Sequence, residues 1–172
     1  IFNIAQAANT SDDLDGLIEI IKDQLQQIID IKNFYIAFYN EEDDTFSSPY
    51  MMDEKDNFKS WPAGKTLTAY VYRTGKPQLL DYKKIEELNK SGAIELLGTL
   101  PKVWLGVPLK IKGKAFGVFA VQSYSNETTY TQSDLEMLKF VSHQMSISLE
   151  RKKVDEALHI AYEKAKESDR LK

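Results

Sequence analysis

Two apolar runs dominate the hydrophobic pattern of the chain; they lie within Val103–Tyr124 and are joined by Lys112-Gly113. Glycine tolerates the positive φ that a tight hairpin turn requires, so the segment predicts a β-hairpin. Gly106 and Gly117 lie inside the two runs, where glycine usually marks a bulge or the close approach of another group. We interpret both as positions of helix-to-sheet packing, with direct ligand contact as the alternative.

Two further stretches place apolar residues at helical spacing. The first follows a cluster of capping residues and acids at residues 9–13 and predicts a helix that ends near Asp30. The second begins at Thr131, with Asp134 in the capping pattern, and meets no helix breaker before Lys172, so it can run over about forty residues. The expected buried stripes are Leu14, Leu17, Ile18, Ile21, Leu25, Ile28 and Ile29 in the first helix, and Leu135, Leu138, Val141, Met145 and Leu149 in the second.

Shorter elements are expected between the first helix and the hairpin. They are strands at Asn33–Asn40, Thr45–Met52 and Gln78–Asp81, and helices at Thr66–Arg73 and Lys83–Lys90. The acidic turn at residues 41–44 is interpreted as a solvated hairpin loop, because a calcium loop needs acids at alternate positions, a glycine and a closing glutamate. Asp53–Lys65 is expected to be an irregular loop whose Trp61 folds back as a lid over apolar surface.

The composition is that of one ordinary globular domain, with 172 residues, 42% of them apolar and 28% charged. The net charge of −4 offers no basic surface, and no apolar run approaches the ~20 residues of a membrane span, so neither nucleic acid nor a membrane is an expected partner. The lack of cysteine excludes disulfides, thiolate chemistry and thioether-linked chromophores. We expect the chain to be a piece of a longer cytoplasmic protein.

No catalytic constellation stands out in the sequence. His143 and His159 are sixteen residues apart on one predicted helix, which separates them by ~24 Å and prevents them from sharing a metal ion. There is no phosphate-binding or dinucleotide-binding glycine motif and no zinc-protease motif. We therefore expect no enzymatic activity, no catalytic residues and no metal site in this fragment.

Aromatic residues are concentrated around the predicted sheet and lid: Phe34, Tyr35, Phe38, Tyr39, Tyr50, Phe58, Trp61, Tyr70, Tyr72 and Trp104. If the lid and the short helix cover one face of the sheet, several of these side chains converge on one cavity. Apolar cavities with a few polar groups are where small ligands bind. The alternative, that these residues form an ordinary core, is slightly favoured.

The last helix changes character after Glu150. Of the 23 residues Glu150–Lys172, 13 are charged. A thin apolar seam continues through Val154, Leu158, Ala161 and Ala165, spaced by four, three and four residues. One small domain cannot bury such a seam, and its spacing is that of a two-stranded coiled coil. A single solvated helix is the alternative.

The order and spacing of these segments resemble the GAF domain family from about residue 12 to residue 150. The segments that carry the resemblance include LTAYVYRTGKP at Leu67–Pro77, WLGVPL at Trp104–Leu109, GVFAVQ at Gly117–Gln122 and YTQSDL at Tyr130–Leu135. The resemblance implies an α+β, PAS-related fold with an antiparallel sheet of five or six strands. Leu14–Ile29 and Leu135–Leu149 would cover one face, and Asp53–Lys90 would roof a ligand pocket on the other. The expected ligand contacts are Tyr50, Phe58, Trp61, Tyr70, Asp81, Trp104 and Gln122.

Departures from the family pattern narrow the set of possible ligands. Members that bind cyclic nucleotides carry F-x-x-x-D-E with an Asn-Lys upstream. Here Tyr130 replaces the phenylalanine and Leu135 replaces the glutamate, and Ser123-Tyr124 occupies the position expected for the Asn-Lys pair. These departures argue against a cyclic nucleotide as the ligand. Members that attach a bilin or reduce a sulfoxide use cysteine, so neither chemistry applies. The ligand, and any cofactor, is left unidentified.

The tail carries a second resemblance. Ala157–Lys172 is similar to the linker helix that precedes the dimerisation and phosphotransfer domain of bacterial sensor histidine kinases. Three segments are implied: the end of an upstream signalling helix at residues 1–10, a sensory domain at 11–150 and a coiled-coil linker at 151–172. A homodimer through the N- and C-terminal helices would relay ligand binding, or an upstream signal, to kinase domains of the same chain in a two-component phosphorelay. A ligand-free dimerisation scaffold is the alternative.

Overall fold

One antiparallel sheet organises the chain, with the strand order β3-β2-β1-β6-β5-β4. The computed structural model describes residues 14–171; the predictions for residues 1–13, for the side chain of Leu14 and for Lys172 lie outside the described residues. The strands are β1 Asn33–Asn40, β2 Thr45–Met52, β3 Ser60–Pro62, β4 Gln78–Asp81, β5 Val103–Ile111 and β6 Lys114–Ser123. The six-stranded sheet confirms the predicted α+β fold.

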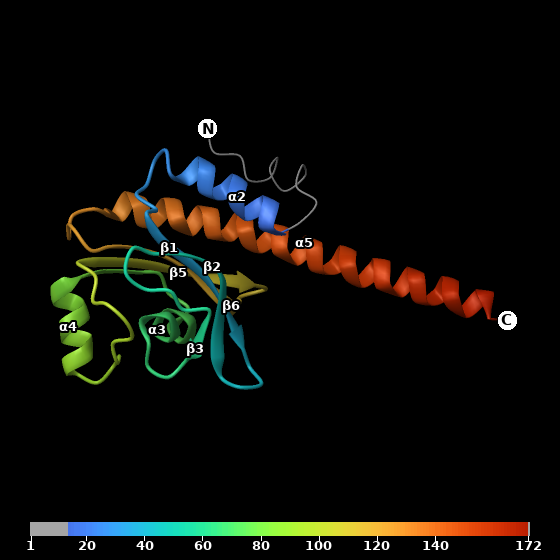
Figure 1. Cartoon of the computed structure of the whole chain (residues 1–172), viewed down its shortest axis with the longest axis horizontal. Helices are drawn as coiled ribbons and strands as arrows, with labels where there is room; N and C mark the ends of the chain where they lie inside the picture. Colours follow the sequence, from blue (N-terminus) through green and yellow to red (C-terminus); the bar gives the residue numbers. More distant parts are fainter. Residues whose placement is uncertain (1–13, 172) are drawn as a thin grey trace.

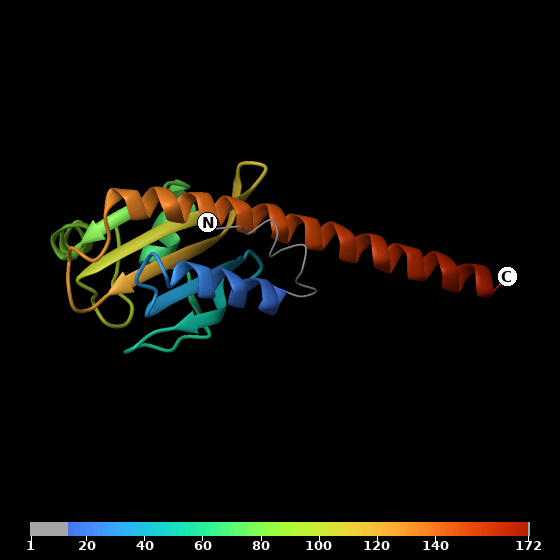
Figure 2. The ribbon, with the colours of Figure 1, turned by 90° about the horizontal axis from the view of Figure 1, so that it is seen from above.

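Helices cover both faces of this sheet (Figure 1). The helices α2 (Leu14–Leu25) and α5 (Gln132–Arg170) lie over one face, and α3 (Leu67–Thr74) and α4 (Tyr82–Lys90) lie on the other side. Seen from above, α2 and α5 both run along the strands, and α5 continues far beyond the edge of the sheet (Figure 2). The helices confirm the predicted arrangement around the sheet.

Alternation along the central strands divides the interior into two cores. In β1, Phe34 and Ile36 belong to the core beneath α2 and α5, whereas Tyr35 and Ala37 belong to the core on the side of α3. The strands β5 and β6 alternate in the same way. Because the central strands are buried on both faces, their sequences are nearly continuous apolar runs.

The β5–β6 hairpin turns at Lys112-Gly113, as predicted, with φ of 52° and 79° at the two residues. Two positive φ values are the signature of a type I′ turn. A Cβ added at Gly106 would overlap the Trp104 indole, and one added at Gly117 would overlap the carbonyl oxygen of Ala37. Both glycines therefore serve close packing. Gly106 packs against the Trp104 ring and Gly117 against the neighbouring strand β1, whereas packing between helix and sheet was predicted.

The first helix is shorter than predicted. It ends at Leu25, and a turn follows before Asp30. Ile28, expected in the buried stripe, is 53% exposed, whereas Ile29 is buried. The helical spacing that would bury both residues no longer applies once the chain leaves the helix at Leu25.

Two other boundaries differ from the predictions because of tertiary contacts. Strand β3 lies inside the segment expected to be an irregular loop, since Trp61 pairs with Phe46 at the edge of the sheet. The helix α4 begins at Tyr82, because the side chain of Asp81 caps it by accepting a 2.9 Å hydrogen bond from the backbone N–H of Lys84.

The last helix is continuous over 39 residues and opens with a capping box between Thr131 and Asp134. The five residues predicted to form its buried stripe are buried: Leu135, Leu138, Val141, Met145 and Leu149. From Val154 to Leu171 every side chain is exposed. Among the described residues, no helix has the length and apolar character that crossing a membrane requires.

Candidate ligand-binding cavity

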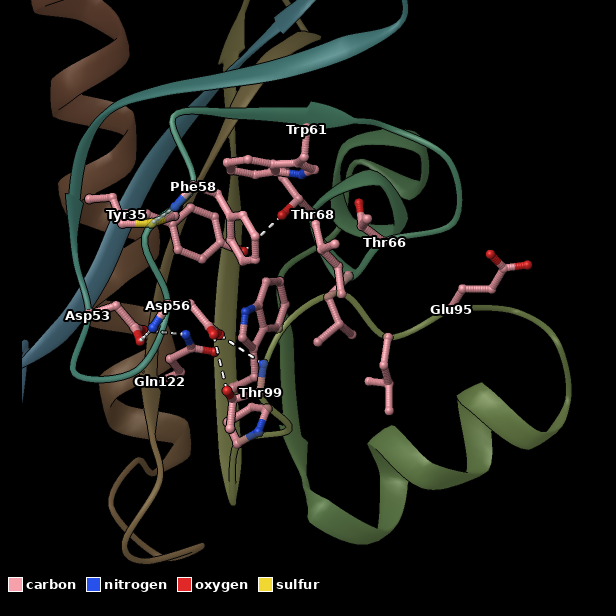
Figure 3. A pocket seen from close by; sticks show the side chains of 16 residues that line it. Tyr35, Asp53, Asp56, Phe58, Trp61, Thr66, Thr68, Glu95, Thr99 and Gln122 are labelled. Carbon is pink, nitrogen blue, oxygen red and sulfur yellow. Dashed lines mark hydrogen bonds between the residues drawn. The ribbon is translucent and has the colours of Figure 1, made fainter.

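A cavity of about 60 Å³ lies on the face of the sheet opposite α2 and α5 (Figure 3). Tyr35, Trp104 and Gln122 of the sheet line it, together with Met51 and the start of α3. Two loops, at residues 53–59 and 95–101, form its roof. The predicted roof, Asp53–Lys90, is thus only partly right, because α4 does not line the cavity and the second loop does.

Four aromatic side chains form the apolar part of the wall. Tyr35 and Trp104 come from the sheet, Phe58 comes from the first loop and Trp61 from β3. The Trp61 ring lies edge-on to that of Tyr35, with centroids 5.8 Å apart, and is 6.4 Å from that of Phe58. Trp61 and Trp104 are 6% and 1% exposed, so surrounding atoms hold both indoles in place.

A pair of hydroxyls and an indole N–H lie within this aromatic wall. The hydroxyls of Tyr35 and Thr68 share a hydrogen bond of 2.8 Å that joins β1 to α3. Burial raises the pKa of Tyr35 to about 12, because the phenolate would lose its hydration. The indole nitrogen of Trp61 is buried and has no hydrogen-bond partner among the described residues. The wall therefore contains one satisfied polar pair and one unsatisfied donor.

Asp53 attaches the first loop to the sheet. One carboxylate oxygen accepts hydrogen bonds from the backbone N–H groups of Lys55 and Asp56, each at 2.9 Å, and from the Tyr124 hydroxyl at 2.7 Å. The other oxygen accepts a 2.6 Å hydrogen bond from the side-chain amide of Gln122. Burial, together with the hydrogen bond to Asp53, raises the pKa of Tyr124 well above its usual range. The network holds the loop at the end of β6.

Asp56 attaches the first loop to the second. Its carboxylate accepts hydrogen bonds from the backbone N–H of Thr99 at 2.9 Å and from the Thr99 hydroxyl at 3.0 Å. Gly98 has φ of 76°, and a Cβ there would lie 2.6 Å from a carboxylate oxygen of Asp56 and 3.0 Å from the Phe58 ring. Only glycine lets the two loops approach this closely, so they form one continuous roof.

The structure brings four of the predicted ligand contacts together. Phe58, Trp61, Trp104 and Gln122 line the cavity. Whether these four residues contact a ligand stays a prediction.

The other three predicted contacts lie outside the cavity wall. Tyr50 pairs with Ile36 across β1 and β2, shares its face of the sheet and donates a hydrogen bond to Asp15 of α2. Tyr70 packs against the core on the side of α3, and Asp81 caps α4. The aromatic residues therefore divide between two cores instead of converging on one cavity.

Sequence reasoning missed Asp53, Asp56, Thr68 and Thr99 as cavity residues. Asp56 and Thr99 are 43 positions apart and lie in loops, where no periodic pattern relates them. Tyr35 could have been singled out, because strand alternation and pairing place it on the same face as Trp104 and Gln122.

The chemistry of the wall suits binding. Asp53, Asp56 and Glu95 are the charged residues that line the cavity, beside hydroxyls, an amide and aromatic faces. In the part of the chain that the structure describes, no group of three or more His, Cys, Asp or Glu residues could hold a metal ion. The groups present can orient a small organic molecule.

The sequence model of the GAF domain family matches residues 11–150. The chain belongs to the GAF domain family. Its fold is similar to that of the GAF domain of an Acinetobacter phosphoenolpyruvate-protein phosphotransferase, with a TM-score of 0.69 and 16% identity over 90% of this chain and 92% of that one. The GAF domain of a two-component sensor histidine kinase from Bacillus halodurans has a TM-score of 0.62 and 14% identity over 84% and 98%.

An enzyme shares the fold as well. The free methionine-R-sulfoxide reductase of Neisseria meningitidis, solved in complex with its substrate, has a TM-score of 0.72 and 12% identity over 88% of this chain and 87% of that one. At such identities the likeness concerns the fold alone. No curated protein matches the chain in sequence. GAF domains are regulatory and sensory modules that commonly dimerise and bind small molecules.

Proposed function

We propose that this chain is the sensory GAF domain of a cytoplasmic sensor histidine kinase. Occupancy of the cavity, or a signal from an upstream domain, biases the packing of two α5 helices in a parallel homodimer. The paired helices then control autophosphorylation in kinase domains of the same chain. None of the residues that the structure describes is assigned a catalytic role in this proposal.

The observation that carries this proposal is that β5 and β6 serve the cavity and α5 at once. Trp104 and Gln122 line the cavity on one face of these strands, while Leu105 and Val121 pack on the other face in the core beneath α5. A ligand that displaces the floor therefore acts on the packing of α5 across the thickness of one sheet. Couplings between two sites are typically ~1–3 kcal/mol, enough to shift such a packing equilibrium.

An apolar stripe on α5 supports pairing with a second copy of the chain. Phe140 and Ile147 are 52% and 41% exposed, and they precede Val154 and Ala161 at intervals of seven residues, the repeat of paired helices. At about 100° per residue, this side of the helix is opposite the buried Met145. We name the set Phe140, Ile147, Val154, Leu158, Ala161 and Ala165 the α5 seam. The seam begins within the domain, earlier than the sequence predicted.

The kinase context rests on the tail. Ala157–Lys172 is similar to the linker helices of sensor histidine kinases, and the Bacillus halodurans neighbour comes from such a kinase. Other neighbours of the same fold come from a phosphotransferase and a methyl-accepting chemotaxis protein, so the fold alone does not select a kinase.

Cysteine cross-linking tests the parallel dimer, because the natural chain has no cysteine. Val154→Cys in the seam is expected to form a disulfide-linked dimer under mild oxidation, since parallel helices in register bring the two copies of this residue together. Glu163→Cys, on the opposite side of the same helix, is the matched control and should remain monomeric on a non-reducing gel. Equal cross-linking of both variants, or of neither, would contradict the proposal.

A ligand-free dimerisation scaffold is the second candidate function. The roof of the cavity favours it, because Asp53 and Asp56 already have hydrogen-bond partners without any ligand. Native mass spectrometry of the freshly purified chain separates the two candidates. A retained small molecule excludes the scaffold, whereas a bare dimer that binds nothing from a metabolite mixture excludes ligand sensing by the cavity.

A further inference from the structure

We propose that the cavity binds a compact organic cation that carries one oxygen acceptor, such as an amino alcohol. This inference rests on the proposed sensory function and specifies its ligand class. Three features of the wall carry it: charges of one sign, four aromatic side chains and one unsatisfied donor.

The charges that line the cavity are all negative. Asp53, Asp56 and Glu95 line it, although the carboxylate of Glu95 points away from the other lining side chains (Figure 3), and no lysine, arginine or histidine is among the lining residues. The carboxylates of Asp53 and Asp56 accept hydrogen bonds from neutral groups, which orient them without cancelling their charge. None of the three carboxylates forms a salt bridge with a described residue.

The basic residue Lys55 of the first loop lies outside the cavity wall. The ammonium of Lys55 lies over the Tyr124 ring, 5.1 Å from its centroid, and Lys55 does not line the cavity. A phosphate or another anion would therefore meet carboxylates and no cationic side chain in the wall, whereas a cation would be attracted. The electrostatics agree with the sequence departures that argue against a cyclic nucleotide.

The aromatic wall selects an organic cation over a metal ion. Tyr35, Phe58, Trp61 and Trp104 line the cavity, and aromatic rings attract alkylammonium groups that lie over their faces. A hard metal ion would instead need several oxygen ligands at close range. The described residues hold no group of three carboxylate, histidine or cysteine side chains that could provide them.

The third feature is the buried indole N–H of Trp61. An unsatisfied buried donor costs about 1–3 kcal/mol, so an acceptor that reaches it gains correspondingly. Because Trp61 lines the cavity, the proposal places a hydroxyl or carbonyl oxygen of the ligand at this donor. The cavity volume of about 60 Å³ favours a compact ligand.

Isothermal titration calorimetry of the whole chain tests the inference, with probes that are matched in shape and differ in charge. Choline and ethanolamine are the cations, and 3,3-dimethylbutan-1-ol and propan-1-ol are their neutral counterparts of the same shape. We expect at least one cation to bind about tenfold or more tightly than its neutral counterpart. Equal binding of cation and alcohol, or tighter binding of the alcohol or of cyclic AMP, would overturn the inference that the ligand is a cation. It would leave the proposal of small-molecule sensing intact. No binding of any probe, with no retained molecule in native mass spectrometry, would overturn both.

Two substitutions locate the binding. Asp56→Asn removes a charge from the wall but keeps an oxygen that can accept a hydrogen bond from Thr99, and it is expected to weaken cation binding about two- to fivefold, with no effect on the alcohol. Phe58→Leu keeps an apolar side chain but removes a ring face, and a loss of about three- to thirtyfold is expected for the cation. Glu42→Gln, in the exposed β1–β2 turn, is the matched control. Unchanged cation binding in both wall variants would place the site elsewhere and overturn the proposal.

Discussion

The side-chain amide of Gln122 at the end of β6 donates a 2.6 Å hydrogen bond to the carboxylate of Asp53 in the loop over the cavity. The two residues are 69 positions apart, so this bond attaches the roof to the strand that also packs beneath α5. Opening of the roof and movement of β6 are therefore linked through this contact and through the hydrogen bond from the Tyr124 hydroxyl to the same carboxylate.

Gln122→Glu is expected to release the first loop. The substitution places a carboxylate beside that of Asp53, so a hydrogen bond becomes a contact of like charges. We expect faster hydrogen–deuterium exchange in residues 53–59 and a free energy of unfolding lower by about 1–3 kcal/mol. Gln132→Glu makes the same chemical change at the exposed first residue of α5 and is the control. Loop exchange at the wild-type rate in Gln122→Glu would argue against this role of the bond.

The sheet and α5 could be predicted because their determinants are local in sequence. Lys112-Gly113 fixes the hairpin turn by backbone conformation, and residues three or four apart, such as Leu135 and Leu138, share one side of a helix. The end of α2 was harder to predict, because Ile28 and Ile29 both fit the helical pattern of buried residues. The helix ends at Leu25, and in the turn that follows Ile28 is exposed while Ile29 is buried.

The cavity could be predicted only in part, because its residues depend on strand pairing and on contacts between loops. Tyr50 resembled a ligand contact, but its register opposite Ile36 directs it toward α2. Asp56 and Thr99 lie in two loops with no periodic pattern, and the bond between them depends on the close approach that Gly98 permits. Such positions follow from the assembled fold and not from any one segment.

Tyr35 is expected to make the domain sensitive to alkaline pH. Burial raises its pKa to about 12 from the ordinary value of 10.0, so the folded chain keeps a proton that the unfolded chain releases. This stabilisation is fully present below about pH 10 and is lost as the pH rises toward about 12. Urea unfolding across this range should show a fall in the free energy of unfolding, of which Tyr35 contributes up to about 2–3 kcal/mol.

Tyr35→Phe is the variant that tests this assignment. It should flatten the alkaline fall, although Tyr124 and Tyr130, whose pKa values burial also raises, will still contribute. At neutral pH it should cost about 1–2 kcal/mol, because the Thr68 hydroxyl loses its partner. Tyr162→Phe, at a side chain that is 63% exposed, is the control. An unchanged alkaline slope in Tyr35→Phe would refute the prediction.

Gly106→Ala is expected to displace the indole in the cavity floor. The added methyl group overlaps the ring of Trp104, which is fully buried, and overpacking of this kind costs about 1–3 kcal/mol. Near-ultraviolet circular dichroism of the tryptophans should change together with the free energy of unfolding. Gly113→Ala, at a turn position with φ of 79° and no atom within 4 Å of the new methyl group, should lose stability without altering that spectrum. A wild-type tryptophan spectrum in Gly106→Ala would mean that the indole is not held by this glycine.

Phe140→Glu is expected to weaken the homodimer even though the substitution lies within the domain and not in the tail. Phe140 is 52% exposed on α5, two seven-residue repeats before Val154, so a charge there enters the proposed α5 seam. Sedimentation equilibrium should show a dissociation constant raised by about tenfold or more, which is ~1.4 kcal/mol. Ile160→Glu introduces the same charge at a side chain that is 55% exposed but lies outside the seam, and it should leave the dimer unchanged. If Val154→Glu dissociates the dimer and Phe140→Glu does not, pairing is confined to the tail, and the cavity cannot act on the paired helices through the part of α5 that packs behind it.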